Sequence, residues 1–284
     1  MNGIVNIYKP LGITSHGVVN KVRHILNIKK VGHTGTLDPD AEGILPICIG
    51  KGTKLAGILT DSDKAYRAVI KLGIVTDTQD ASGKILEEHD VNVSKEQFET
   101  AVHNFVGKIM QTPPMYSALK VGGRKLCDLA RQGIEVERKP REIVIKSIEI
   151  SDFNGITATL DVECTKGTYI RTLCHDIGQT LGCGAIMQSL TRTKSGIFEI
   201  KNSVTLEEFE KNPVEFITPP DKIFSHLPEY IANEEETKKI KNGIRIFAKT
   251  ENGKTYRVYS DKGEFLALSV SENGKLIMQT AFFG

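Results

Sequence analysis

Gly32-His33-Thr34-Gly35-Thr36-Leu37-Asp38-Pro39 places a single carboxylate in a short polar loop that contains two glycines. Glycine permits positive φ angles and close approach of the backbone to a ligand. Pro39 restricts Asp38 to extended or polyproline geometry, so the backbone presents this carboxylate stiffly. A carboxylate held in this way suits a nucleophile or a general base. The alternative interpretation is a polar turn in which Asp38 caps the segment that follows.

Regular secondary structure is predicted on both sides of this loop. Residues 4–8 have the pattern of a short strand, and Ser15 is predicted to cap a helix whose apolar positions run to Leu26. Further strands are expected at residues 44–49, 66–74, 143–150 and 157–164, and further helices at residues 94–106, 124–131 and 169–180. Because strands and helices do not alternate regularly, the sequence predicts an α+β fold with a mixed sheet.

The C-terminal part has a different pattern. Four prolines mark a linker within residues 212–232. Beyond it, short strand-like runs at residues 244–249, 255–259, 264–270 and 275–280 are separated by turn sequences that end in glycine. This spacing predicts a small β-rich terminal domain or barrel.

The composition is that of an ordinary soluble globular protein, since 39% of its 284 residues are hydrophobic and 25% are charged. The N-terminus lacks a basic region followed by an apolar run, so no signal peptide is predicted. No apolar run approaches the ~20 residues that a membrane span needs. The five scattered cysteines include no C-x-x-C pair, which indicates reduced thiols in the cytoplasm.

The net charge of +2 is too small to indicate a nucleic-acid partner, but the charge is unevenly distributed. Residues 120–141 are rich in Lys and Arg, whereas residues 207–236 are rich in Asp and Glu. Such asymmetry is typical of a polyanion-binding face with a solvated connector behind it, and it also fits an ordinary solvated surface.

Two stretches resemble nucleotide-binding and metal-binding motifs, but each lacks residues that the motif requires. Gly50-Lys51-Gly52-Thr53 lacks both the Ser or Thr directly after the lysine and the earlier glycine of a phosphate-binding loop. Residues 77–83 resemble a calcium loop but have Ser82 where a glycine is required, so a polar turn between strands is predicted. The histidines do not cluster at metal-ligand spacing. The sequence therefore predicts neither a metal nor an organic cofactor.

Three further stretches complete a pattern with the Asp38 loop. Residues 9–15 end the first strand with a stiff turn, residues 63–68 open a strand with Tyr66, and residues 165–172 join a strand to a helix that carries Arg171. Each stretch alone is compatible with an ordinary edge aromatic or surface cation. Together, in this order and at this spacing, the four closely resemble the TruB family of tRNA pseudouridine synthases over nearly the whole chain.

The resemblance implies a pseudouridine synthase fold with a mixed central sheet. It implies a catalytic domain at residues 1–230, with an RNA-gripping insertion at about residues 112–142, and a PUA-like RNA-binding domain at residues 231–284. The implied reaction is isomerisation of uridine to pseudouridine at position 55 in the T loop of tRNA. The implied enzyme is a cytoplasmic monomer that acts on tRNA without a cofactor, a membrane or a protein partner.

The resemblance also assigns roles to residues. It makes Asp38 the nucleophile after base flipping, pairs Arg171 with it, and places Tyr66 against the target uracil, where it can take a sugar proton. The implied substrate-binding residues are Lys9, Pro10, His33, Lys166, Tyr169 and Leu190; the first two brace the catalytic loop and His33 helps to hold the flipped-out base. The cations implied to contact the RNA backbone are Lys120, Arg124 and Lys125.

Three other functions stay open at this point. The chain could be an RNA chaperone in which the carboxylate is incidental. It could be a hydrolase that uses Asp38 with Asp40 or Glu42 and releases free uracil. It could also belong to the guide-RNA-dependent branch of the same superfamily. The chain starts almost directly at its first motif and lacks long extensions, which favours a stand-alone bacterial enzyme.

Overall fold

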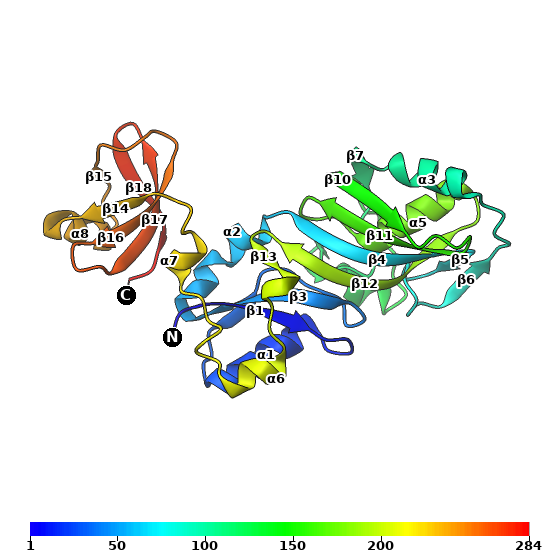
Figure 1. Cartoon of the computed structure of the whole chain (residues 1–284), viewed down its shortest axis with the longest axis horizontal. Helices are drawn as coiled ribbons and strands as arrows, with labels where there is room; N and C mark the ends of the chain where they lie inside the picture. Colours follow the sequence, from blue (N-terminus) through cyan, green and yellow to red (C-terminus); the bar gives the residue numbers. More distant parts are fainter. Residues whose placement is uncertain (284) are drawn as a thin grey trace.

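The structure is a computed structural model that describes residues 1–283. A nine-stranded mixed sheet forms the larger part of the molecule, and a separate five-stranded sheet forms the C-terminal part (Figure 1). The large sheet has the order β1-β3-β12-β4-β11-β10-β7, with β2 paired to β3 and β13 paired to β12. Its strands are β1 (Gly3–Lys9), β2 (Val31–His33), β3 (Glu42–Ile49), β4 (Lys64–Leu72), β7 (Gly107–Gln111), β10 (Arg141–Ser151), β11 (Thr157–Cys164), β12 (Ala185–Ser195) and β13 (Phe198–Glu199).

One parallel contact makes the large sheet mixed. β3 and β12, the second and third strands of that order, run parallel, while the other pairs along that path are antiparallel. Gly43 of β3 has φ 103°, and a Cβ there would lie 2.4 Å from the Arg192 carbonyl oxygen. The two strands can approach this closely because residue 43 has no side chain. The predicted α+β fold with a mixed sheet is confirmed.

Helices cover the two halves of the large sheet separately (Figure 1). α1 (Ser15–Leu26) and α6 (Leu206–Lys211) pack over β1 and β3, where Val18 and Phe209 are buried with Leu45. α3 (Lys95–His103) and α5 (Ile170–Leu181) pack over the other half, where Phe98 and Ile177 enter the second core. The junction between the two halves lies at β3, β12 and β4.

The start of α1 corrects one sequence prediction. The N-cap of this helix is Thr14, whose Oγ1 accepts a hydrogen bond from Gly17 N at 2.9 Å. Ser15 is the first helical residue, and its buried Oγ bonds instead to the backbone of Leu37. Either hydroxyl could cap the helix on sequence alone, and the distant loop decides which one is used.

The basic segment contains a hairpin that the sequence reading missed. β8 (Lys120–Val121) pairs with β9 (Arg124–Lys125) across Gly122 and Gly123, which have φ angles of 58° and 82°. Two glycines at positive φ form the tight turn that joins two antiparallel strands. The predicted helix at 124–131 therefore begins later, as α4 (Leu126–Ala130). A second hairpin, β5 (Ile74–Thr76) with β6 (Ile85–Glu88), surrounds the polar turn at residues 77–83.

The proline-rich segment at 212–232 connects the two sheets, and part of it is packed against both of them, which was not predicted. Thr218 pairs with Ile4 of β1, and Ile223 and Phe224 are buried in a cluster with Leu268 and other residues of both sheets. Short helical segments join this junction: η1 (Gly50–Leu55), α2 (Ala56–Thr60), η2 (Ile200–Asn202) and α7 (Pro220–Ile223). Apolar residues between the prolines therefore fasten the two sheets together.

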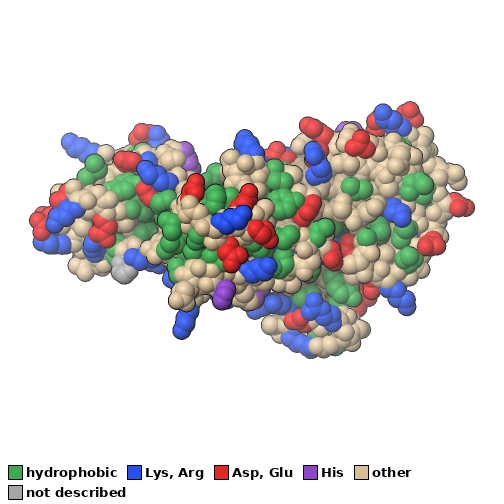
Figure 2. Space-filling view, turned by 60° about the horizontal axis from the view of Figure 1, so that its bottom comes forward, with side chains coloured by type: hydrophobic (Ala, Val, Ile, Leu, Met, Phe, Trp, Pro, Cys, Tyr) green, Lys and Arg blue, Asp and Glu red, His purple; other side chains and the backbone are tan. Residues whose placement is uncertain are grey.

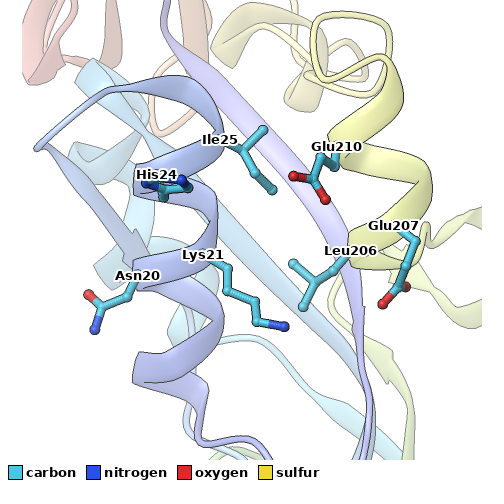
Figure 3. A pocket seen from close by; sticks show the side chains of 7 residues that line it. All are labelled: Asn20, Lys21, His24, Ile25, Leu206, Glu207 and Glu210. Carbon is cyan, nitrogen blue, oxygen red and sulfur yellow. The ribbon is translucent and has the colours of Figure 1, made fainter.

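The acidic residues of the same region lie partly on α6, beside α1. Figure 3 shows an open hollow between the two helices, with Lys21 and His24 on α1 and Glu207 and Glu210 on α6. Its volume is about 420 Å³, and it contains no residue of the Asp38 loop. Part of the acidic segment therefore belongs to α6 and lines the hollow beside α1.

The terminal sheet confirms the expected β-rich C-terminal domain. Its strand order is β14-β16-β17-β18-β15. The elements are β14 (Glu229–Ala232), α8 (Glu234–Lys241), β15 (Ile246–Phe247), β16 (Thr255–Ser260), β17 (Phe265–Glu272) and β18 (Lys275–Ala281). The sequence reading missed β14 and α8, although Asn233 and Glu236 form a capping box at the start of that helix. β14 spans the predicted domain boundary between residues 230 and 231.

Within residues 1–283, no helix is long and apolar enough to cross a membrane.

Candidate active site

A cavity of about 580 Å³ opens where the two halves of the large sheet meet. The 34–38 loop, the starts of β4 and α5, and the end of β12 surround it, and residues 116–119, which precede the basic segment at 120–141, form a further wall. Six of the residues predicted from the sequence line this cavity: Asp38, Tyr66, Lys166, Tyr169, Arg171 and Leu190. The fold therefore brings together side chains that lie more than 150 positions apart in the chain.

Buried donors fix the backbone of the Asp38 loop from several sides. The Ser15 hydroxyl donates to Leu37 O at 2.9 Å and accepts from Leu37 N at 2.8 Å. The fully buried Lys9 ammonium donates to Pro39 O at 3.2 Å and to Ile13 O at 2.8 Å. These bonds hold the residues immediately before and after Asp38. The carboxylate is thus supported by a backbone with little freedom to move.

Arg171, in the first turn of α5, faces the Asp38 carboxylate. Its Nη2 lies 3.1 Å from Asp38 Oδ2, so the predicted ion pair is present. The same nitrogen donates to Tyr116 O at 2.8 Å, and Nη1 donates to Thr78 O at 3.2 Å. Desolvation raises the pKa of Asp38 above its ordinary value, and the Arg171 charge opposes this rise. The guanidinium therefore favours the ionised carboxylate that a nucleophile needs.

A second carboxylate, that of Asp80, contacts the other terminal nitrogen of Arg171. Asp80 Oδ2 lies 3.5 Å from Arg171 Nη1, and Asp80 Oδ1 accepts bonds from Thr78 Oγ1 and from the backbone and hydroxyl of Ser82. This residue lies in the 77–83 turn, to which the sequence reading gave no role at the site. The many hydroxyl and carboxylate side chains of this turn could have marked it as a candidate part of the site. Nothing in the sequence, however, places the turn beside Arg171.

The central strands supply the opposite side of the cavity. Tyr66 of β4 pairs with Arg192 of β12, and Leu190, two residues earlier on β12, pairs with Ala68. Residues two apart on a strand point to the same face, so Leu190 and Arg192 both face the cavity. Arg192 is 2% exposed and was not singled out from the sequence. A lone arginine in a strand gives no local signal for such burial.

Comparison with known proteins identifies the family of this chain. A family model described as "TruB family pseudouridylate synthase (N terminal domain)" matches residues 23–170, and one described as "tRNA pseudouridylate synthase B C-terminal domain" matches residues 171–222. A protein of Clostridium acetobutylicum named tRNA pseudouridine synthase B is 48% identical over 98% of this chain and 99% of its own length. The chain belongs to the TruB family.

Other TruB-family relatives agree with this assignment. The tRNA pseudouridine synthase B of Clostridioides difficile is 55% identical over 74% of this chain and 71% of its own length. Among solved structures, a chain of a Cbf5-Nop10-Gar1 complex has a TM-score of 0.73 and 28% identity, covering 99% of this chain and 85% of that chain. The protein is thus a pseudouridine synthase, an isomerase, with the pseudouridine synthase fold and a PUA-like C-terminal domain.

The remaining predicted pocket residues differ in their placement. Lys166 pairs with Asp61 at 2.8 Å across the cavity rim. Both backbone polar groups of Tyr169 bond to the Gln111 side chain, at 2.8 and 3.0 Å, so β7 fixes the backbone at the start of α5. Lys9, Pro10 and His33 are not among the residues that line the cavity. The bonds from Lys9 to the carbonyl oxygens of Ile13 and Pro39 support a role in bracing the loop more than a contact with substrate.

His33 lies at the entrance to the Asp38 loop. Its Nδ1 accepts a hydrogen bond from Gly35 N at 3.2 Å, so the ring helps to set the turn. Burial lowers the pKa of His33, and the nearby Arg192 charge lowers it further. The neutral imidazole is favoured in this position.

Lys64 lines the cavity and was not predicted. Its ammonium donates to the carbonyl oxygens of Thr60 and Ser62, and burial lowers the pKa of Lys64 to about 8. This lysine therefore ties the turn before β4 to the cavity wall.

The three cations expected to contact RNA backbone lie apart from this cavity. Lys120, Arg124 and Lys125 line a separate open hollow of about 610 Å³ on the β8–β9 hairpin, together with Arg131. On the face shown in Figure 2, acidic and basic side chains are interspersed over most of the surface, and a projecting lobe carries several Lys and Arg side chains close together. The hairpin offers exposed positive charge, whereas the cavity holds Asp38 paired with the buried Arg171.

Asp40 and Glu42, which a hydrolase would require, do not line the cavity. Glu42 Oε1 instead accepts from Thr191 Oγ1 at 3.2 Å. Within the described residues 1–283, no group of three or more His, Cys, Asp or Glu side chains could hold a metal ion.

Proposed function

We propose that this enzyme converts uridine 55 in the T loop of tRNA to pseudouridine, with Asp38 as the nucleophile acting on a flipped-out base. The curated relatives named tRNA pseudouridine synthase B support tRNA as the substrate. The observation that carries the proposal is the Asp38–Arg171 ion pair, at 3.1 Å, facing a cavity of about 580 Å³.

The reaction needs little beyond positioning and a nucleophile. The N1–C1′ bond breaks, the uracil turns, and C5 bonds to C1′; C5 loses a proton and N1 gains one, so the product has the mass of the substrate. No electrons are supplied or removed. One ionised carboxylate, held by a cation and aimed at the sugar and base, meets the requirement.

The apolar and aromatic side chains of the cavity suit an unstacked base. Tyr66 and Tyr169 provide ring faces and Leu190 an apolar surface, all from different elements around Asp38. An enzyme that acts on a base inside folded RNA must first remove the base from its stack. We assign Tyr66 to the face of the target uracil, and His33 to the loop conformation that holds the flipped-out arrangement.

RNA binding is assigned to two surfaces outside the cavity. The Lys120, Arg124 and Lys125 side chains would contact phosphates, because exposed cations on a projecting hairpin can follow an RNA backbone. The domain at residues 231–284 would supply a second contact. We propose a monomer that needs no protein partner, since the chain is 48% identical to a relative named tRNA pseudouridine synthase B and only 28% identical to the neighbour solved in a Cbf5-Nop10-Gar1 complex.

Chemical mapping of pseudouridine tests this function. Purified protein is incubated with an unmodified tRNA transcript and with a matched transcript that carries cytidine at position 55. Pseudouridine at position 55 of the first transcript, with no modification elsewhere in either, is the expected result. Release of free uracil would instead indicate a hydrolase, and binding without modification would indicate an RNA chaperone. Gel filtration of the active protein tests the monomer.

A further inference from the structure

Arg192 is a buried cation with no buried counter-ion. Its side chain is among the largest fully buried ones, at 2% exposure. Its Nε donates to Ile44 O at 2.8 Å and its Nη2 donates to Gly35 O at 3.2 Å. Among the ion pairs found within 4.0 Å in residues 1–283, none includes Arg192. Burying such a charge is costly, so a specific use for it is expected.

The strand register places this guanidinium beside the Tyr66 hydroxyl. Tyr66 and Arg192 are direct partners on the antiparallel strands β4 and β12, and both line the cavity. Side chains of directly paired residues lie on the same face of a sheet, close enough to interact. The guanidinium lies near enough to the phenol for its charge to act on the phenol oxygen. Arg192 therefore lies beside Tyr66 and bonds, through Gly35 O, to the Asp38 loop.

We propose that Arg192 is a positioning residue for the isomerisation, which ties the Asp38 loop to Tyr66 and holds the Tyr66 oxygen as a hydrogen-bond acceptor so that its proton faces the cavity. This inference rests on the proposed function, in which Tyr66 contacts the target uridine. Arginine suits the task because its planar fork has five donors, which reach the carbonyls of Gly35 and Ile44 and the phenol together. A lysine has one nitrogen and would lose part of this set.

The charge of Arg192 also acts on the phenol. Burial raises the pKa of Tyr66, and the adjacent guanidinium opposes that rise. Negative charge that develops on the phenol oxygen during the reaction would thus be stabilised by a fixed cation. Removing the cation should raise the pKa of Tyr66 further, and a purely structural role would leave it unchanged.

Arg257 is a matched control in the C-terminal sheet. It is 7% exposed, donates to the carbonyls of Leu227 and Ser225, and donates to the Tyr259 hydroxyl at 3.2 Å. It thus reproduces a buried arginine beside a tyrosine in a different sheet from the cavity, although Arg257 also pairs with Glu229 at 3.0 Å. Because the chemical step is measured at saturating tRNA, replacing Arg257 should lower stability without changing that step, whatever its effect on tRNA affinity.

The experiment compares Arg192→Met, Arg192→Lys and Arg257→Met. The single-turnover rate is measured at saturating tRNA, together with tRNA affinity and the melting temperature. The same proteins are labelled with 3-fluorotyrosine, and fluorine NMR follows the titration of residue 66, assigned by the loss of its signal in Tyr66→Phe.

Arg192→Met should lose about 100-fold in rate with near-normal tRNA affinity, and the pKa of fluorotyrosine 66 should rise. Arg192→Lys should lose about tenfold in rate while the pKa of that residue stays near its original value. Arg257→Met should match the wild-type protein in both. An unchanged rate and an unchanged pKa in Arg192→Met would overturn the proposal.

Should Arg192→Met not fold, Arg192→Lys decides alone: a wild-type rate overturns the proposal, and a slower rate at normal melting temperature and affinity supports it. If the wild-type protein forms no pseudouridine, the proposed function fails, while the fluorine titration still tests the coupling of Arg192 to Tyr66.

Discussion

The Asp38 loop and the β8–β9 hairpin are both short polar segments rich in glycine, but the structure treats them in opposite ways. Ser15, Lys9 and Arg192 reach the loop from different elements and bond to its backbone at Leu37, Pro39 and Gly35. The hairpin is exposed at Lys120, Val121, Arg124 and Lys125, and it is paired mainly with itself.

The difference follows from what each segment would bind. A nucleophile must be aligned with one atom, so movement of even about 1 Å reduces the rate strongly. Phosphate contacts position a long polyanion and tolerate changes in side-chain conformation. Mutations in the loop should therefore affect the chemical step, and mutations in the hairpin should affect binding.

The largest effect is expected for Asp38→Asn. The amide preserves the shape of the side chain but cannot act as a nucleophile, so the rate should fall about 10⁴-fold or more while tRNA binding is largely kept. Tritium release from 5-tritiated uridine in tRNA measures the rate, and filter binding measures affinity. Asp40→Asn, two residues further along and not among the residues that line the cavity, is the control. Near-normal turnover of Asp38→Asn would remove Asp38 from the mechanism.

Arg171→Lys should follow, with a loss of about 100-fold in single-turnover rate and a modest loss of affinity. A lysine ammonium cannot contact Asp38, Asp80 and two backbone carbonyls with one planar group. Arg67→Lys is the control, because Arg67 makes a bidentate pair with Asp161 on the exposed face of the same sheet. Equal single-turnover rates for wild type and Arg171→Lys would show that the fork geometry does not matter.

The triple variant Lys120→Gln, Arg124→Gln and Lys125→Gln should weaken tRNA binding about tenfold or more and leave the rate at saturating tRNA unchanged. Each lost phosphate contact should flatten the log–log salt dependence of binding by roughly 0.7–0.9. The charge-preserving triple exchange Lys120→Arg, Arg124→Lys and Lys125→Arg should keep the wild-type slope. Identical slopes for all three proteins would mean that these cations only solubilise the hairpin.

Ser15→Ala should lower the single-turnover rate about tenfold, because it removes two hydrogen bonds to Leu37, next to Asp38. Thr14→Ala removes the N-cap of the same helix and should lower stability by about 1 kcal/mol without slowing the chemistry. Thermal melting and single-turnover assays of the two variants separate loop anchoring from helix capping. The prediction is wrong if both variants slow the reaction equally.

The smallest effect concerns Asp176 of α5, the helix that carries Arg171. Burial raises the pKa of Asp176 to about 6 in the folded protein, so folding penalises its charged form. This penalty is complete above pH about 6 and disappears below the ordinary value of 3.8, where the carboxyl is protonated in both states. Asp176→Asn should thus stabilise the protein by about 1 kcal/mol at pH 8 and not at pH 3.5. Urea unfolding at both pH values checks this, with the exposed Asp90→Asn as control.

Prediction from sequence was most successful where the signal is local. The 94–106 helix begins at the capping box of Ser94 and Gln97, and the strands of the terminal sheet follow their turn sequences. The cavity residues Asp38, Tyr66 and Arg171 were found because each lies in a motif with its own sequence pattern. Their roles in the reaction stay predictions.

The errors occurred where two distant segments compete or cooperate. Thr14 and Ser15 are equivalent as caps until Leu37 is placed beside one of them. The packing of the linker at 212–232 was missed because the apolar partners of Ile223 and Phe224 lie in both sheets, far away in the sequence.

The sequence by itself determined the α+β class, the terminal β-rich domain and the motifs of the TruB family, because hydrophobic periodicity, turn residues and short motifs are properties of neighbouring positions. Only the tertiary structure decided that Asp80 reaches Arg171 and that Arg192 lies beside Tyr66 with no buried counter-ion. The physical reason is that the energy of a buried charge depends on which groups surround it in space, and those groups come from positions far apart in the chain.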